Sequence, residues 1–135
     1  MKKEYVVGFL FNAMRSRVLL IRKTHPEWQA GLLNGIGGRV ESKELPIAAM
    51  KREFMEEVND CDNLEWERFL TLYFDHAIIH FFVADRGGTF EKTYPRSPTN
   101  EKLEVFDVCQ LLIARDIVYN IRLTIPLAID FLNHH

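Results

Sequence analysis

Short apolar runs along the chain are separated by polar turns, and two longer segments repeat apolar residues at helical spacing. The runs are rich in β-branched and aromatic residues, which is typical of strands, whereas the helical spacing predicts helices with one face against a core. The strands are expected at Tyr5–Ala13, Arg17–Lys23, Ile36–Glu41, Leu64–Phe74, Ala77–Ala84 and Leu103–Val108, and the helices at Leu45–Val58 and Leu123–Asn133.

The order of these elements predicts the fold class. The first two runs are joined by a short polar turn and form an expected hairpin, while Ala77–Ala84 is apolar throughout and should lie inside a sheet. Pro126 is placed near the start of the second helix, where a proline is tolerated. Strands flanked by two helices predict an α/β sandwich with a mixed sheet. Thr24–Gly31 and Arg86–Asn100 are expected loops, the latter lying over the functional site.

Composition narrows the class of protein. A chain of 135 residues with 47% hydrophobic and 27% charged residues is expected to form one globular domain. A net charge of −2 without a basic cluster argues against a nucleic-acid polymer as partner. We find no membrane-spanning stretch or signal region, so the cytoplasm is the expected location. The sequence leaves a homodimer open.

Three carboxylates carry the first chemical signal. Glu53, Glu56 and Glu57 are related by i, i+3 and i+4, so they lie together on the helix face opposite the apolar stripe. Like charges at this spacing weaken a helix, and a bound cation would remove the conflict. Magnesium suits such oxygen ligands, with manganese as an alternative. The alternative is that these glutamates form a solvent-exposed charged face of the helix.

Glycines precede this helix in the run Gly35-Ile36-Gly37-Gly38. Without a Cβ atom, glycine adopts positive φ and lets the backbone approach a ligand closely. A main-chain carbonyl of this run is therefore a further candidate oxygen ligand. A plain hairpin or bulge would use the same residues.

The combined spacing resembles the Nudix box, G-x5-E-x7-R-E-U-x-E-E-x-G-U, where U is an apolar residue. The matching positions are Gly38, Glu44, Arg52, Glu53, Phe54, Glu56 and Glu57. The chain departs from the pattern at Asn59, which replaces the last glycine, and at Asp60, which replaces the last apolar residue. Asn is the usual second choice for the left-handed conformation at a helix end, so we interpret these departures as changes in packing.

This resemblance implies a Nudix fold, with a mixed sheet between helices in an α/β/α sandwich, as a single domain over residues 1–135. It also implies magnesium-dependent hydrolysis of a nucleoside diphosphate derivative. By resemblance, the Gly37 carbonyl, Glu53 and Glu57 are the main metal ligands and Glu56 assists. Arg52 would orient the glutamates by salt bridges.

The sequence constrains the identity of the general base and of the phosphate contacts less than that of the metal ligands. Glu53 is one candidate base, but family members often use a glutamate from a loop outside the box. Glu101 is the best placed by chain order, with Glu91 and Glu104 behind it. Candidate contacts to substrate phosphates are Lys23, Arg22 and Arg39, although each would be equally ordinary as a surface cation. Gly38 is a further candidate for substrate binding.

Asn34 is the main indication of substrate. The run Asn34 to Glu41 looks like the N-G-x-G-G-K-x-E of MutT-like and oxidised-purine nucleoside triphosphatases, where the asparagine binds the base. Asn offers both a donor and an acceptor, but it is also a common turn residue before glycine. Asn120 is a second candidate to read a base edge. The acidic pair of the eukaryotic oxidised-purine enzymes is missing, which weakens a specific assignment to 8-oxo-dGTP.

We therefore expect hydrolysis of a nucleoside triphosphate, with an ordinary or oxidised purine, to the monophosphate and pyrophosphate. One alternative is a Nudix hydrolase of ADP-ribose, a nucleotide sugar or another diphosphate. The other is a module that senses a nucleotide without cleaving it, which usually needs a DNA-binding domain or a damaged box.

Overall fold

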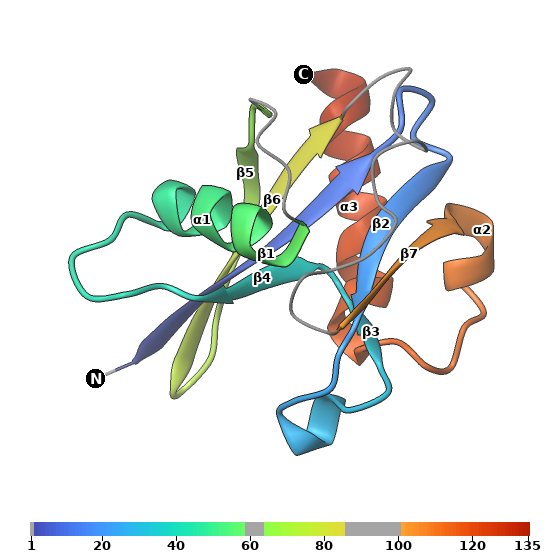
Figure 1. The fold of residues 1–135 in the computed structure, drawn as a ribbon. Helices are drawn as coiled ribbons and strands as arrows, with labels where there is room; N and C mark the ends of the chain where they lie inside the picture. The colour runs from blue at the N-terminus through green and yellow to red at the C-terminus, as the bar shows by residue number, and fades with distance from the viewer. Residues whose placement is uncertain (1, 59–63, 86–100) are drawn as a thin grey trace.

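The computed structural model describes residues 2–58, 64–85 and 101–135. Figure 1 shows how these residues form a sheet with a helix on each side. The strands are β1 (Lys3–Phe11), β2 (Arg17–Arg22), β3 (Leu33–Asn34), β4 (Ile36–Arg39), β5 (Glu67–Tyr73), β6 (Ala77–Asp85) and β7 (Lys102–Asp107). The helices are α1 (Pro46–Val58), α2 (Val108–Leu111) and α3 (Tyr119–His134), with a 3-10 turn η1 (Glu27–Gln29).

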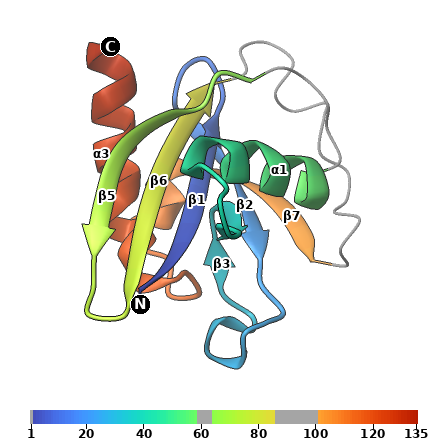
Figure 2. The ribbon, with the colours of Figure 1, turned by 90° about the vertical axis from the view of Figure 1, so that its left-hand side faces the viewer.

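The sheet is mixed, as expected. Strand β1 runs parallel to β6 on one side, and its other side pairs antiparallel with β4 and β2. Strand β2 continues to β3 and β7, while β5 extends the sheet beyond β6. Helices α1 and α3 cover opposite faces of this sheet, which is clearest in Figure 2. The expected α/β/α sandwich is confirmed.

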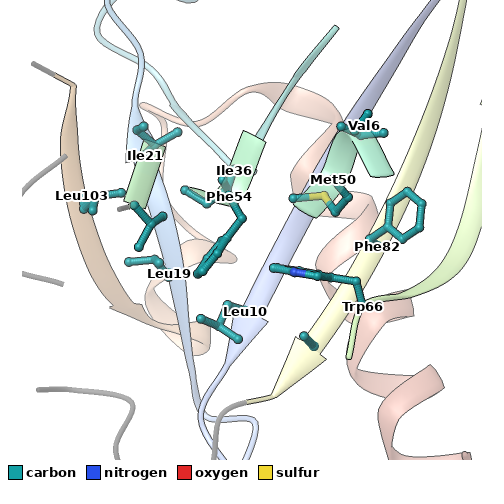
Figure 3. Close-up of a cluster of buried hydrophobic side chains, with 13 residues drawn as sticks. Val6, Leu10, Leu19, Ile21, Ile36, Met50, Phe54, Trp66, Phe82 and Leu103 are labelled. Carbon is teal, nitrogen blue, oxygen red and sulfur yellow. The ribbon is translucent and has the colours of Figure 1, made fainter. Parts of the chain in front are cut away.

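Alternation along β1 divides the core into two layers. Val6 and Leu10 point into the cluster under α1, shown in Figure 3, whereas Phe9 and Phe11 point into the cluster under α3. Successive strand side chains point to opposite faces, so an apolar strand supplies both layers. Gly8 lies between Val6 and Leu10, and a Cβ there would come within 2.4 Å of the Met50 side chain.

Helix α1 forms as its apolar stripe predicts. Met50, Phe54 and Val58 are buried and Ile47 packs against the same cluster. The Phe54 ring meets the Trp66 indole edge-on, with centroids 5.4 Å apart. Pro46 begins the helix, where its missing N–H costs no intrahelical hydrogen bond. Glu57 is buried on α1 as well, so the expectation that all three glutamates lie opposite the apolar stripe was wrong, and of the three only Glu56 is exposed.

The expected start of the last helix was wrong. Helix α3 begins at Tyr119 instead of Leu123, so Pro126 lies inside the helix instead of near its start. The start is held by β3, because the Val118 N–H donates to the Leu33 carbonyl at 2.9 Å. Ile121 is fully buried and adds packing energy to the earlier turn. Sequence reading also missed β3 and α2, which are too short to show a period.

Some expectations fall outside the described residues. They concern the loop Arg86–Asn100, the candidate base Glu91 and the box departures Asn59 and Asp60. Within the described ranges, none of the helices has the length and apolar character that crossing a membrane requires.

Candidate active site

Helix α1 lies close to strand β4 at the two glycines of the strand, Gly37 and Gly38. A Cβ built on Gly38 would come within 2.5 Å of the Glu53 carboxyl group, so the glycine allows Glu53 to lie against the strand. The Gly37 N–H donates to Glu57 Oε1 at 3.2 Å, and a Cβ on Gly37 would lie 1.9 Å from the Val6 carbonyl oxygen. Close approach is thus the reason for both glycines. The expected positive φ is absent, because among the described glycines only Gly31 has one.

Arg52 connects the box in space. Its guanidinium donates to both carboxylate oxygens of Glu44, at 2.8 and 2.9 Å, and to Glu53 Oε1 at 2.9 Å. It also donates to the Arg39 carbonyl at 2.9 Å and to Glu56 at 3.4 Å. The hydrogen bond from Arg52 lowers the pKa of the Glu44 carboxyl to about 2. Arg52 therefore holds the strand, the loop and the helix together.

Glu57 is the unusual group of the site. Only 5% of the residue is exposed, and burial raises the pKa of its carboxyl to about 8, against a lowering effect of Lys23. The negative charges of Glu53 and Glu101 raise this pKa further. Within the described part of the chain, Glu57 Oε2 has no hydrogen-bond partner. A buried carboxylate oxygen without a partner is unfavourable, so a bound cation or a proton on Glu57 would stabilise the site.

Glu101, the residue immediately before β7, lies close enough to Glu57 for its charge to act on it. Its Oε2 accepts hydrogen bonds from the Thr24 N–H at 2.6 Å and the Thr24 hydroxyl at 3.1 Å, and Lys23 Nζ lies 3.4 Å from Oε1. Burial alone would raise the pKa of this carboxyl, but these hydrogen bonds and the Lys23 charge outweigh burial and lower it. Glu101 is therefore ionised at neutral pH, as a general base must be.

A divalent cation fits the chemistry of this cluster. Glu57 Oε2 is an unused oxygen ligand, and Glu53 and Glu101 add negative charge around it. Among the residues that the structure describes, no three acidic, histidine or cysteine side chains already converge as a complete metal-binding group. Glu53 is turned toward Arg52, and Glu56 is half exposed beside the same guanidinium.

The candidate base-reading residues lie at the β3 end of the sheet. The side chain of Asn34 already has two local partners, because Oδ1 accepts from the Gly35 N–H at 2.8 Å and Nδ2 donates to Gln29 Oε1 at 3.0 Å. This is the turn role that sequence reading kept as an alternative. Asn120 lies in the first turn of α3, next to the Val118–Leu33 contact, and its side chain is half-buried.

The cationic candidates are separated. Lys23 lies beside Glu101, whereas Arg22 is occupied by Glu104 at 2.7 Å and Asp116 at 3.0 Å. Arg39 is exposed at the end of β4. Glu104, a reserve candidate for the base, is thus tied to Arg22. Thr24 was missed, because nothing in a loop threonine signals that it will meet a glutamate 77 residues further along the chain.

Comparison with known proteins identifies the family of the chain. The family model described as the NUDIX domain matches residues 1–124. Among curated proteins, none matches the chain in sequence.

Solved structures extend the comparison to the fold. A Nudix-family hydrolase from Clostridium perfringens is 22% identical, covering 98% of this chain and 99% of its own, with a TM-score of 0.71. MutT, from a study of Aliivibrio salmonicida and Vibrio cholerae, is 21% identical, with 93% and 97% covered and a TM-score of 0.73. The Nudix domain of Shewanella oneidensis NrtR, complexed with ADP ribose, is 16% identical, with 98% and 89% covered and a TM-score of 0.75.

At these identities the structural likeness establishes the fold, and the family model establishes the relationship. Because that model spans residues 1–124, most of the chain, the chain belongs to the Nudix hydrolase family.

Proposed function

We propose that this Nudix hydrolase cleaves a nucleoside triphosphate to the monophosphate and pyrophosphate in a reaction that depends on a divalent cation. The observation that carries the proposal is the buried Glu57 carboxylate, whose Oε2 lacks a partner among the described residues, beside Glu53 and an ionised Glu101. Three carboxylates kept together in this way are costly in a structural role and useful in a metal site.

The residues of the box would hold the cation. Glu53, Glu57 and the Gly37 carbonyl are the proposed ligands, with Glu56 assisting. Magnesium is assigned because it is a hard cation that prefers oxygen, and manganese would suit the same ligands. When bound, the cation supplies charge neutralisation on the phosphates and lowers the pKa of a water molecule.

Glu101 is proposed as the general base. It is ionised, and Thr24 fixes one carboxylate oxygen, so the group can accept the proton of the attacking water without turning. Arg52 keeps Glu53 and Glu44 in place during turnover. Lys23, Arg39 and the Gly38 backbone are the proposed contacts to phosphate oxygens. Glu53 would remain close to the cation, so we favour Glu101 over Glu53 for this role.

A purine nucleotide is the favoured substrate, with the oxidation state of the base left open. Asn34 and Asn120 lie on neighbouring segments, since β3 contacts the start of α3. For Asn34 to read a base, its amide would exchange the Gln29 contact for one with the nucleotide. ADP-ribose is the second candidate, because the NrtR domain with a similar fold was solved with that ligand.

We also propose that residues 1–135 act as one domain, since both helical layers pack on a shared sheet.

Product analysis tests this proposal. The protein is incubated with magnesium and a panel of ordinary and oxidised nucleoside triphosphates, ADP-ribose and nucleotide sugars, beside Glu57→Gln and the exposed control Glu67→Gln. We expect one triphosphate to give monophosphate and pyrophosphate, with turnover lost in Glu57→Gln and kept in Glu67→Gln. Turnover of ADP-ribose alone would contradict a triphosphate substrate and favour a nucleoside diphosphate derivative. Binding without turnover across the panel would favour the nucleotide-sensing alternative.

A further inference from the structure

The outward face of α3 carries an apolar stripe that the fold does not use. Tyr119, Leu123 and Leu127 follow one another at i, i+4 and i+8, and they are 71%, 70% and 50% exposed. The opposite face of α3 is already packed, because Ile121, Thr124, Ile125 and Ala128 are buried against the sheet. The stripe is thus additional to the core.

A second element widens this surface. Leu112 and Ile113, in the turn after α2, are 51% and 83% exposed. The Arg122 guanidinium donates to the Ala114 carbonyl and holds that turn beside the stripe. Five large apolar side chains amount to a patch on the order of 500 Å², near the upper end of what a monomer shows. A specific interface buries about 800 Å² per partner, which the patch with its polar rim approaches.

The charges beside the stripe identify the partner. Arg122 lies one residue before Leu123, whereas Asp130 lies toward the other end, three residues after Leu127. Two parallel copies of α3 would place equal charges together. Two antiparallel copies with Leu123 on the partner's Leu127 would bring Arg122 within about 3 Å, measured along the helix axis, of the partner's Asp130. The same contact would then occur twice, as two-fold symmetry requires.

Both charged groups have hydrogen-bonding capacity left. Arg122 uses Nη2 for the Ala114 carbonyl, and a guanidinium has further donors. Oδ1 of Asp130 lies 3.4 Å from Nδ1 of His134, and both side chains are largely exposed, so the carboxylate remains accessible to a second chain. No other charged group of α3 lies between the two leucines.

We propose that the outward face of α3, with the turn after α2, binds a second copy of this chain in an antiparallel, two-fold symmetric homodimer. The interface has Leu123 and Leu127 at its centre and two Arg122–Asp130 pairs at its rim. This surface lies on the side of the sheet away from α1, so the dimer does not depend on the proposed catalytic function.

Sedimentation equilibrium of the whole chain across a concentration series tests the dimer. We expect Leu123→Glu to weaken self-association by at least about tenfold, because a charge replaces the central contact. Met14→Glu is the matched control, since Met14 is an apolar residue that is 84% exposed in the β1–β2 turn, outside the patch. Circular dichroism spectra that match wild type would confirm folded variants.

Charge exchange distinguishes this geometry from other dimers. Arg122→Asp and Asp130→Arg should each weaken self-association, whereas an equimolar mixture of the two should form a heterodimer with both pairs restored. A wild type that remains monomeric would overturn the proposal and leave the face to a different partner. A dimer that survives Leu123→Glu, or single-charge variants that do not recover on mixing, would overturn it equally.

Discussion

Gly38 shows how one missing methyl group shapes the site. Any side chain there would meet the Glu53 carboxyl within 2.5 Å, and that carboxyl is the mobile end of a side chain. We therefore expect Gly38→Ala to fold while displacing Glu53 and reducing turnover about tenfold or more. Gly37→Ala should instead destabilise the fold by about 2 kcal/mol or more, because its Cβ would meet the Val6 main chain. Thermal unfolding and steady-state hydrolysis separate the two effects. Equal losses of stability in both variants would contradict this account.

Thr24 is expected to set the acid limb of the pH profile. Its hydroxyl helps to lower the pKa of Glu101, and a base works only while it is ionised. In Thr24→Val the N–H bond remains but the hydroxyl is lost, so the pKa of Glu101 should rise. The fall of kcat/KM on acidification should then begin at higher pH, with Thr24→Ser close to wild type. A Thr24→Val profile superimposable on wild type would argue against Glu101 as the base.

At the scale of single residues, the sequence indicated which side chains form the candidate site more completely than it indicated which of them contact one another. Arg52, Glu53 and Glu57 stand in a recognisable order, so their proximity could be predicted from helical spacing. The pairing of Thr24 with Glu101 depends on how β2 and β7 align, and no local pattern encodes that register. The sequence around Asn34 was compatible with two roles, recognition of the base and a turn before glycine. Its hydrogen bonds to Gly35 and Gln29 favour the turn role in this structure.

One side chain of helix α1, Arg52, contacts both β4 and the loop that precedes the helix. Arg52 binds the Arg39 carbonyl and both oxygens of Glu44, a planar geometry that lysine cannot reproduce. We expect Arg52→Lys to lower the thermal midpoint by a few degrees and to reduce turnover more than tenfold, because Glu53 loses its support. Lys51→Ala, one position earlier on the exposed side of α1, should change neither. Wild-type turnover in Arg52→Lys would exclude the positioning role.

Elements with a strong period could be predicted closely, and short ones could not. Helix α1 differs from its predicted start by one residue, because its stripe and Pro46 mark the boundary. Helix α3 begins earlier than predicted, because β3 holds its first turn through a backbone contact that periodicity does not see. Pro126 looked like a start signal but lies inside the helix, where tertiary packing outweighs its local cost.

For the whole molecule, the site should make the stability of the cation-free protein depend on pH. Burial raises the pKa of Glu57 to about 8, above the ordinary value of 4.5, so the folded state holds this proton more tightly than the unfolded state. The stabilising effect is complete below about pH 4.5 and is lost as pH rises through about 8. We expect Glu57→Gln to exceed wild type in thermal midpoint by several degrees at pH 9 without metal. Added magnesium should narrow this difference, and a variant less stable than wild type at every pH would contradict the burial argument.

The overall architecture followed from the sequence because each of the longer strands and both long helices carry their own apolar pattern. The functional cluster did not follow as completely, since it assembles from α1, β4, the loop after β2 and the start of β7. Only the first two belong to the box. The position of Glu101 next to Glu57 is a property of the closed sheet, and chain order could only rank it among several glutamates.

The central claim is that the Glu57 cluster binds a divalent cation, and calorimetric titration of magnesium in buffers of different ionisation enthalpy tests it most directly. With a pKa of about 8, Glu57 is mainly protonated at pH 7, and a ligand carboxylate must release its proton. We predict binding with release of close to one proton per cation in wild type, and weak binding without proton release in Glu57→Gln. Tight binding with the same proton release in both proteins, or no binding to wild type with or without nucleotide, would contradict the account.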